Sequence, residues 1–375
     1  MKQQLQTLLF VIAFLSLLSA CGGSAETSPP SIPPVVIEET LLKSLTNYIN
    51  TNVSADEAGI AVLLIKNDEV VYKEGKGLAN MAQNLSITPD TGFRLGSVSK
   101  VFTAIAIMKL YEQGMLSLDD SILTYLPELS TSWQDINIHH LLSHQSGIPS
   151  FINDYSIDFW PNGATNQDIV EYFIANDALE FIPGSRGEYS NTGFLLLAEI
   201  ISRVSGISFA DYLDLEIFQV LGMTNSYIAD EFSQQRDGDA LNFASLTNYY
   251  NQDIYTVGAM GQVSSLNDMQ MFTTGMLNHL IITSETFDLL VQAHTPELFY
   301  DQSHNQPFTA YGYGAMVEVN NSRVFGHSGG FDGFRTDLLI RMDFDWQLVV
   351  LTNGGDKTGE YIEGIKSIVA AFNQE

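Results

Sequence analysis

At positions 93–100 the chain reads Phe-Arg-Leu-Gly-Ser-Val-Ser-Lys, and the apolar run behind it predicts a helix over 101–112. Residues three apart lie on one face of a helix, so Lys100 can reach the hydroxyl of Ser97. Ser99 points roughly 100° away from Lys100, because an α-helix turns by that angle at each residue. We therefore interpret Ser97 as a nucleophile and Lys100 as the group that accepts its proton.

The predicted position of Ser97 is the first turn of this helix. There the backbone N–H groups have no partner within the helix, and the positive end of the helix dipole stabilises negative charge on oxygen. Burial of Lys100 would favour its neutral form, which can take the serine proton. A pattern as short as Ser-x-x-Lys also arises by chance, so a second interpretation stays open, in which Ser97 caps the helix and Lys100 is a solvated charge.

A second group of polar residues is Tyr189-Ser190-Asn191, which precedes another apolar run. If the oxygen of Tyr189 lay between Ser97 and Lys100, it could carry a proton to a leaving group. The side-chain amide of Asn191 could donate a hydrogen bond to a substrate carbonyl. The alternative for these residues is a packed tyrosine and a helix cap.

The third group is His327-Ser328-Gly329-Gly330, at the end of a predicted strand. Because glycine has no side chain, a substrate could lie against the strand edge in contact with Ser328 and Gly329, and His327 would line the same cleft. The Gly330 N–H could join the Ser97 N–H as an oxyanion hole. The alternative is an ordinary strand end followed by a turn.

Strand-like segments gather at the two ends of the chain. A helical pattern over 41–49 precedes two β-rich runs near the N-terminus, and three β-rich runs precede a helix over about 360–372 near the C-terminus. The β-rich runs are 59–65, 70–73, 323–327, 334–340 and 347–352. Between them, helical patterns cover 101–112, 167–174, 194–204, 209–218 and 266–280.

This distribution predicts an α+β fold. One antiparallel sheet would be formed by both chain ends, about 36–95 and 300–375, and flanked by helices. A mainly helical domain, about 96–299, would be inserted between the two ends. The candidate site would lie where the sheet and the helical domain meet.

The first twenty residues predict a signal peptide, because the apolar run from Leu8 to Leu18 is about half the length that a membrane-spanning helix needs. The run ends in Leu-Ser-Ala-Cys, which resembles a bacterial lipobox and predicts cleavage and lipidation at Cys21. Residues 21–35 hold four prolines and predict an extended tether in front of a folded domain over 36–375. We therefore expect a lipid-anchored protein of the bacterial cell envelope, facing the periplasm at the outer membrane; an ordinary signal peptide is the alternative.

The composition and charge indicate which classes of molecule the protein can bind. With 16 basic and 44 acidic residues the net charge is −28, which disfavours nucleic acid. A small-molecule or peptide substrate, a monomer and no cofactor are expected. His139, His140 and His144 invite a metal, but no glutamate stands between the last two as it does in His-Glu-x-x-His, so no metal is expected.

The three motifs, in this order and with these separations, resemble the serine β-lactamase-like superfamily of class C β-lactamases, D-Ala-D-Ala carboxypeptidases and related esterases. The resemblance spans roughly residues 40–370. It extends into flanking segments, at 93–97, 138–149, 217–223 and 350–353.

The resemblance implies roles for individual residues. Ser97 would be the nucleophile, Lys100 its activating partner, Tyr189 the second proton carrier and Asn191 a contact to the substrate amide. His327 departs from the lysine found in the matching motif of class C β-lactamases and is similar to the His-x-Gly form of carboxypeptidases and esterases. Histidine lacks the permanent positive charge of lysine, so its presence disfavours β-lactamase activity.

The implied activity is that of a serine hydrolase that acts through an acyl-enzyme on amides or esters. It would resemble a D-Ala-D-Ala carboxypeptidase or an esterase, with at most weak β-lactamase activity. The alternative is a lipoprotein that binds β-lactams or peptidoglycan covalently with little turnover, as a sensor or scavenger would.

Overall fold

The computed structural model describes residues 34–152, 160–161, 163–233, 236–243, 254–295, 310–318, 321–331 and 333–371. The predicted signal peptide, Cys21 and most of the predicted tether lie outside the described residues. The first helix, α1 (Pro34–Asn52), begins within the last two residues of that tether. In the described part of the chain no single helix is both long and apolar enough to cross a membrane. The helix α5 (Asn191–Ser205) and the helical stretch Phe209–Leu221 reach that length and apolar character only when taken together, and they are bent by 78° relative to each other.

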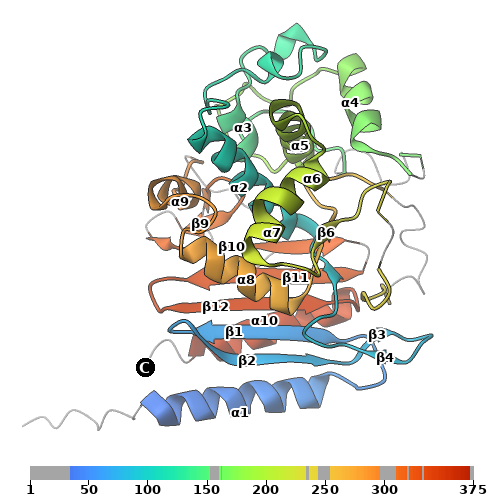
Figure 1. The fold of residues 1–375 in the computed structure, drawn as a ribbon, viewed down its shortest axis with the longest axis vertical. Helices are drawn as coiled ribbons and strands as arrows, with labels where there is room; N and C mark the ends of the chain where they lie inside the picture. The colour runs from blue at the N-terminus through green and yellow to red at the C-terminus, as the bar shows by residue number, and fades with distance from the viewer. Residues whose placement is uncertain are drawn as a thin grey trace, which may run out of the picture.

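One antiparallel sheet of seven strands is built from the two ends of the chain, in the order β2-β1-β12-β11-β10-β9-β8 (Figure 1). β1 (Ile60–Lys66) pairs along its whole length with β12 (Trp346–Thr352), which joins the N-terminal hairpin to the C-terminal strands. The other strands of this sheet are β2 (Glu69–Lys76), β8 (Ala310–Tyr311), β9 (Met316–Glu318), β10 (Asn321–Phe331) and β11 (Phe334–Arg341).

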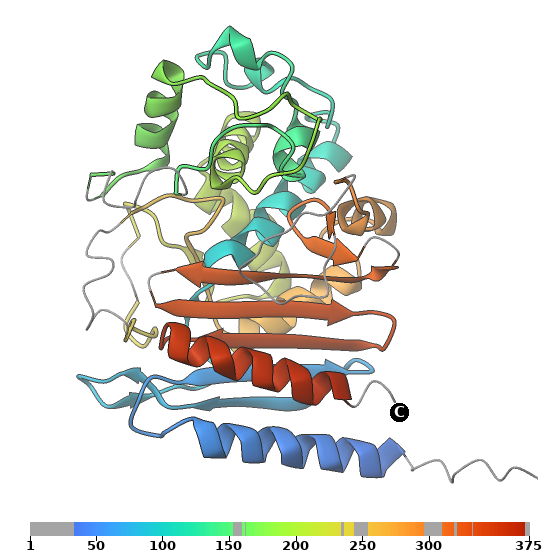
Figure 2. The same cartoon turned by 180° about the vertical axis from the view of Figure 1, so that it is seen from behind.

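Both faces of this sheet are covered. α1 and α10 (Asp356–Ala371) lie side by side against one face, as Figure 2 shows. The side chains of β1 alternate between the two faces: Val62 and Leu64 belong to the core under α1 and α10, and Leu63 belongs to the larger core on the other face. A strand that is buried on both faces needs a continuous apolar run, which the sequence has at 59–65.

The segment between the two parts of the sheet is mainly helical, with α2 (Ser99–Glu112) at its centre (Figure 1). Every side chain from Ser99 to Met108 is buried, because α5, α6 and α9 pack around this helix. The other helices of the segment are α3 (Ile138–Leu142), α4 (Asn166–Ala175), α6 (Phe209–Leu213), α7 (Gln219–Leu221), α8 (Leu266–Leu277) and α9 (Ser284–Val291). The predicted α+β fold, with a sheet from both chain ends and a helical insertion, is confirmed.

Several helices differ from their predicted bounds: α1 begins at Pro34 rather than at 41, and α10 begins at Asp356 rather than at about 360. α8 ends at Leu277 rather than at 280, because His279 has a left-handed φ of 56° and the Leu280 N–H donates to the Gly275 carbonyl at 2.9 Å. The helix predicted over 209–218 consists of α6 and a following π-helical turn, and α7 extends it.

The third motif lies inside a strand rather than at its end. β10 continues to Phe331, and its residues 327–331 pair with 334–338 of β11. β8 and β9, which the sequence did not predict, have only two and three residues and pair with each other. Three further short strands, β5 (Phe93–Arg94), β6 (Tyr227–Ile228) and β7 (Gln262–Ser264), form a small sheet. Of these strands, β5 lies directly before the turn that carries Ser97.

Candidate active site

A tight turn brings Ser97 to the start of α2. Gly96 has a left-handed φ of 53°, and a Cβ at this residue would lie 2.8 Å from the backbone nitrogen of Gly330, so no side chain fits there. The turn is tied to its surroundings on both sides: the Leu95 N–H donates to the Gln262 carbonyl at 2.8 Å, and the Thr336 hydroxyl donates to the Leu95 carbonyl at 2.7 Å. These contacts hold Ser97 between the helical segment and the sheet.

The alternative interpretation of the first motif, in which Ser97 caps the helix and Lys100 is a solvated charge, does not fit this geometry. The short 3₁₀ helix Gly96–Val98 and the following α2 have no side-chain hydrogen bond at their N-caps, which are Leu95 and Val98. Ser97 is therefore not the cap of either described helix. Lys100 is fully buried and so is not a solvated charge.

The amine of Lys100 has three oxygen neighbours. Its Nζ lies 3.0 Å from Ser97 Oγ, 2.8 Å from Asn191 Oδ1 and 2.8 Å from the Ala259 carbonyl oxygen. Burial holds the pKa of Lys100 well below its usual value of 10.5. No carboxylate among the described residues lies within ion-pair distance to oppose this effect, so the geometry favours the neutral amine.

A neutral amine has two N–H groups and one lone pair. The Asn191 and Ala259 oxygens can only accept hydrogen bonds, so they occupy the two N–H groups. The remaining tetrahedral position, which holds the lone pair, then faces the Ser97 hydroxyl. This arrangement is suited to removing a proton from Ser97.

Asn191 is oriented by a residue that the sequence analysis did not identify. Its Nδ2 donates to the Ser150 hydroxyl at 3.1 Å, and its backbone N–H donates to the same oxygen at 3.3 Å. The amide oxygen therefore faces Lys100, as described above. Asn191 begins α5, whose N-cap is Ser190, with its hydroxyl accepting from the Gly193 N–H. The donation from Asn191 to a substrate stays a prediction.

The ring of Tyr189 lies next to Lys100. Lys100 Nζ is 4.7 Å from the centre of the ring, and Tyr189 is half-buried at the end of an exposed stretch. The structure thus brings together Ser97, Lys100, Tyr189 and Asn191, which come from two separate segments of the chain, 97–100 and 189–191. The proton-carrying role of Tyr189 remains a prediction.

The glycines of β10 lie directly against the turn that carries Ser97. A Cβ at Gly329 would lie 2.1 Å from the Leu95 carbonyl oxygen and 3.1 Å from the Ser97 backbone nitrogen. Together with the close approach of Gly96 and Gly330, this contact places the backbone of Gly330 beside that of Ser97. The two proposed oxyanion-hole residues are therefore neighbours.

His327 is buried, and both of its ring nitrogens have protein partners. Nδ1 lies 2.6 Å from the Ser328 carbonyl oxygen, which can only accept, so Nδ1 carries the proton of the neutral ring. Nε2 lies 3.0 Å from the Tyr311 hydroxyl and then accepts from it. A neutral His327 in this arrangement has no N–H directed at a substrate, although its ring lies 6.1 Å from the ring of Tyr189.

Ser328 points toward the opposite face of the sheet. Residues that pair across antiparallel strands share a face, and Ser328 pairs with Asp337, whose carboxylate lies 3.0 Å from Lys366 Nζ on α10. The Ser328 hydroxyl is buried and has no hydrogen-bond partner among the described residues. The contact predicted between Ser328 and a substrate could therefore come only from its backbone.

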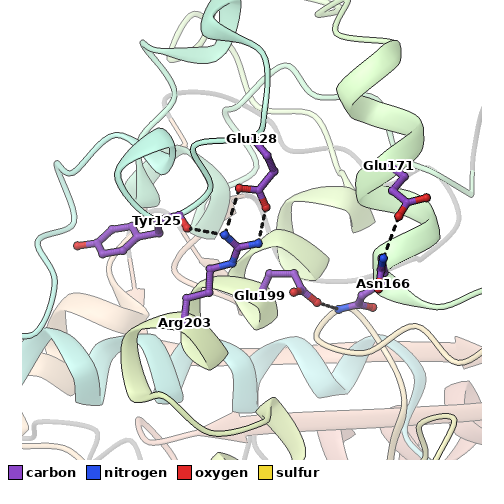
Figure 3. Close-up of polar contacts among 7 residues, drawn as sticks. Tyr125, Glu128, Asn166, Glu171, Glu199 and Arg203 are labelled. Atoms are coloured by element: carbon purple, nitrogen blue, oxygen red, sulfur yellow. Dashed lines mark hydrogen bonds and ion pairs between the residues drawn. The ribbon is translucent and has the colours of Figure 1, made fainter.

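The Ala259 carbonyl, which completes the surroundings of Lys100, is held by a polar network. The Thr103 hydroxyl donates to the Gly258 carbonyl at 2.7 Å, and the Val257 N–H donates to Asn166 Oδ1 at 2.9 Å. Figure 3 shows that Asn166 in turn contacts Glu199 of α5, at 3.1 Å. The network joins α2, α4 and α5 to the loop that carries the carbonyl.

The three neighbouring histidines have separate partners. His139 Nδ1 lies 2.8 Å from the Tyr313 hydroxyl, and His140 Nδ1 accepts from the Asn137 N–H at the start of α3. His144 Nδ1 accepts from the Ser190 N–H. In the described ranges these histidines do not form part of any group of three or more metal-ligating side chains.

Comparison with known proteins gives consistent matches. The family model described as Beta-lactamase matches residues 45–371. Penicillin-binding protein 4* of Bacillus subtilis is 28% identical over 323 residues, which cover 81% of this chain and 70% of that protein. Protein flp of Staphylococcus aureus is 27% identical over 304 residues, covering 79% of this chain and 59% of flp, so the match spans about three fifths of that relative.

The fold is shared with a solved enzyme. The crystal structure of D-amino acid amidase from Ochrobactrum anthropi SV3, complexed with L-phenylalanine amide, matches with a TM-score of 0.74 and covers 90% of this chain and 98% of that one. The sequence identity is 22%, so this likeness shows the fold alone.

Proposed function

This chain belongs to the beta-lactamase family, and on that premise we propose that it is a serine hydrolase that forms an acyl-enzyme on Ser97. Its substrates are amides or esters, as for a D-Ala-D-Ala carboxypeptidase or an esterase. The observation that carries the proposal is the buried amine of Lys100, which two carbonyl oxygens orient toward the Ser97 hydroxyl.

The proposed reaction has two steps. Lys100 Nζ takes the proton of Ser97 while Oγ attacks the acyl carbon, and the N–H groups of Ser97 and Gly330 stabilise the oxyanion. Tyr189 delivers a proton to the leaving group as its bond to the acyl carbon breaks. The proton that Lys100 took from Ser97 then passes to Tyr189, so both groups regain their starting forms. Water attacks the acyl-enzyme and loses a proton to Lys100, and this proton passes to Ser97 Oγ as the ester bond breaks and the acid product leaves.

The environment of His327 supports substrates that do not depend on a carboxylate. With one ring nitrogen donating to the Ser328 carbonyl and the other accepting from Tyr311, neutral His327 cannot donate to a substrate carboxylate. A charge-assisted hydrogen bond contributes about 1.5–3 kcal/mol, against about 1 kcal/mol for a neutral one. Loss of such a bond disfavours β-lactams and peptides that end in D-Ala relative to neutral esters.

We expect steady-state turnover of short-chain p-nitrophenyl esters, with kcat/KM at least about tenfold higher than for nitrocefin, since about 1.4 kcal/mol corresponds to a factor of ten. The measurement is kcat/KM for both substrates and for a D-Ala-D-Ala peptide between pH 5.5 and 8.5. A burst without steady-state turnover for every substrate would instead support the covalent-binding alternative. Preference for nitrocefin throughout would mean that a cation holds the carboxylate, with Arg335 the first to test, because a Cβ at Gly330 would lie 3.1 Å from its Nη1.

We also propose that the protein is anchored by lipid at Cys21 and faces the periplasm. The support is the lipobox-like sequence and the proline-containing segment that separates Cys21 from α1. In this proposal the folded domain acts as a monomer on small-molecule or peptide substrates and uses neither nucleic acid nor a cofactor.

Replacement of Cys21 by serine is expected to move the protein from the membrane fraction to the soluble fraction and to stop incorporation of labelled fatty acid. Esterase activity per molecule should not change, because Cys21 precedes the folded domain. The measurement is fractionation together with labelling, with Ser19→Ala as a control that keeps the cysteine. An unchanged membrane fraction, or labelling that survives the change, would contradict lipidation at Cys21.

A further inference from the structure

His144 occupies a backbone conformation that is costly for a residue with a side chain. It follows α3 with a φ of 58°, in the left-handed region, and is 1% exposed. Such a conformation persists only where the surrounding contacts stabilise it. The contacts of His144 therefore indicate what the conformation achieves.

Those contacts hold the two neighbours of Tyr189. The Glu188 N–H donates to the His144 carbonyl oxygen at 2.8 Å, and the Ser190 N–H donates to His144 Nδ1 at 3.1 Å. The ring of His144 lies against the ring of Tyr189, with 4.4 Å between the ring centres. One residue thus contacts the chain before Tyr189, the chain after it and its ring.

The surroundings keep the imidazole in the form that can make this contact. Burial lowers the pKa of His144 well below 6.5. A neutral ring leaves Nδ1 as an acceptor for the Ser190 N–H. The rings of Phe194 and Tyr311, at 5.0 Å and 4.5 Å between centres, fix the plane of the imidazole.

The other contacts of the chain before Tyr189 lie further from its ring: the Gly184 N–H donates to the Gln145 carbonyl at 2.9 Å, and Arg186 pairs with Glu188 at 2.6 Å. Residues 184–186 and Glu188 are exposed, and Tyr189 itself is only half-buried. A group that transfers a proton has to be held closely, because a misplacement of about 1 Å can cost on the order of a hundredfold in rate. Tyr189 therefore needs a fixed contact from the core of the domain.

We propose that His144 is a positioning residue, which holds Tyr189 where it can carry a proton between Lys100 and the leaving group. The inference rests on the proposed function of Ser97, Lys100 and Tyr189. It assigns to His144 no contact with the substrate.

The test replaces the side chain without straining the backbone. His144→Gly keeps the left-handed conformation but removes both the acceptor and the ring, and His144→Asn restores an acceptor near the position of Nδ1 and also tolerates left-handed φ. We expect acylation by a fluorophosphonate or an ester to be about 10- to 100-fold slower in His144→Gly and to recover most of that loss in His144→Asn. His279→Gly is the matched control, because His279 is an exposed histidine with a φ of 56° at the end of α8; it should acylate at the wild-type rate.

A double-mutant cycle with Tyr189→Phe separates positioning from a general effect on the fold. If His144 acts through Tyr189, His144→Gly should slow acylation less than about twofold in the Tyr189→Phe background. An equal loss in both backgrounds, or a folded His144→Gly protein with the wild-type rate, would overturn the proposal. If His144→Gly does not fold, His144→Asn in both backgrounds decides the same question: a loss confined to proteins that contain Tyr189 supports positioning, and an equal loss overturns it.

The same data separate this inference from the proposed function. Wild-type labelling at Ser97, and its loss in Ser97→Ala, test the function. Only the dependence of the His144 effect on Tyr189 tests the positioning role.

Discussion

Replacement of Ser97 by alanine is expected to abolish covalent labelling by fluorophosphonate or penicillin and to lower ester turnover by about 10⁶-fold, the scale seen when a serine hydrolase loses its nucleophile. The reason is geometric, because Ser97 Oγ is the only hydroxyl within the described structure that lies within hydrogen-bond distance of Lys100 Nζ, at 3.0 Å. The measurement is the mass of the intact protein after incubation with the probe, followed by peptide mapping of the adduct.

Ser99→Ala is the matched control. Ser99 stands two residues further along the chain, as the first residue of α2, and its buried hydroxyl accepts from the Gln262 N–H at 3.3 Å instead of facing Lys100. Loss of that hydrogen bond costs about 1 kcal/mol of folding free energy and should leave labelling largely intact. An adduct mapped to Ser99, or labelling that persists in Ser97→Ala, would reject Ser97 as the nucleophile.

The contact between Ser97 and Lys100 was predictable because it is local. Helical spacing fixes which side chains three residues apart can meet, and the structure has this pair in contact. The position of the sheet was predictable for a similar reason, since strands buried on both faces give continuous apolar runs such as 59–65. The two-residue strand β8 carries no such pattern, so Tyr311 could not be placed next to His327 from the sequence.

Other parts of the site depend on backbone contacts and conformations, which the residue types in the sequence do not reveal. The Ala259 carbonyl approaches Lys100 through its backbone, which every residue has, from a position 159 residues away in sequence. His144 was grouped with two other histidines because its left-handed conformation cannot be read from sequence. The direction of Ser328, in contrast, could have been inferred from the two-residue period of the strand, since His327 and Gly329 face the site and the residue between them faces away.

Replacement of Lys100 by alanine is expected to slow acylation by roughly 10²- to 10⁴-fold, the usual contribution of a positioned general base, while the domain stays folded. Lys109→Ala is the matched control: Lys109 lies in the same helix, and its Nζ is 2.7 Å from a Glu216 carboxylate oxygen near the surface. The measurement is the acylation rate followed by mass spectrometry, with thermal unfolding to verify that each variant folds. Equal rates in wild type and Lys100→Ala would exclude Lys100 as the base.

The pH profile distinguishes a base from a fixed positive charge. Because burial lowers the pKa of Lys100, the neutral amine persists to lower pH than in a solvated lysine. The acylation rate should therefore be lost as the pH falls through that lowered pKa, and this limb of the profile should be missing in Lys100→Ala. Lys100→Arg keeps a cation that cannot give up its proton, so it should be as slow as Lys100→Ala. A folded Lys100→Arg protein with nearly the wild-type rate would mean that the charge, and not proton transfer, activates Ser97.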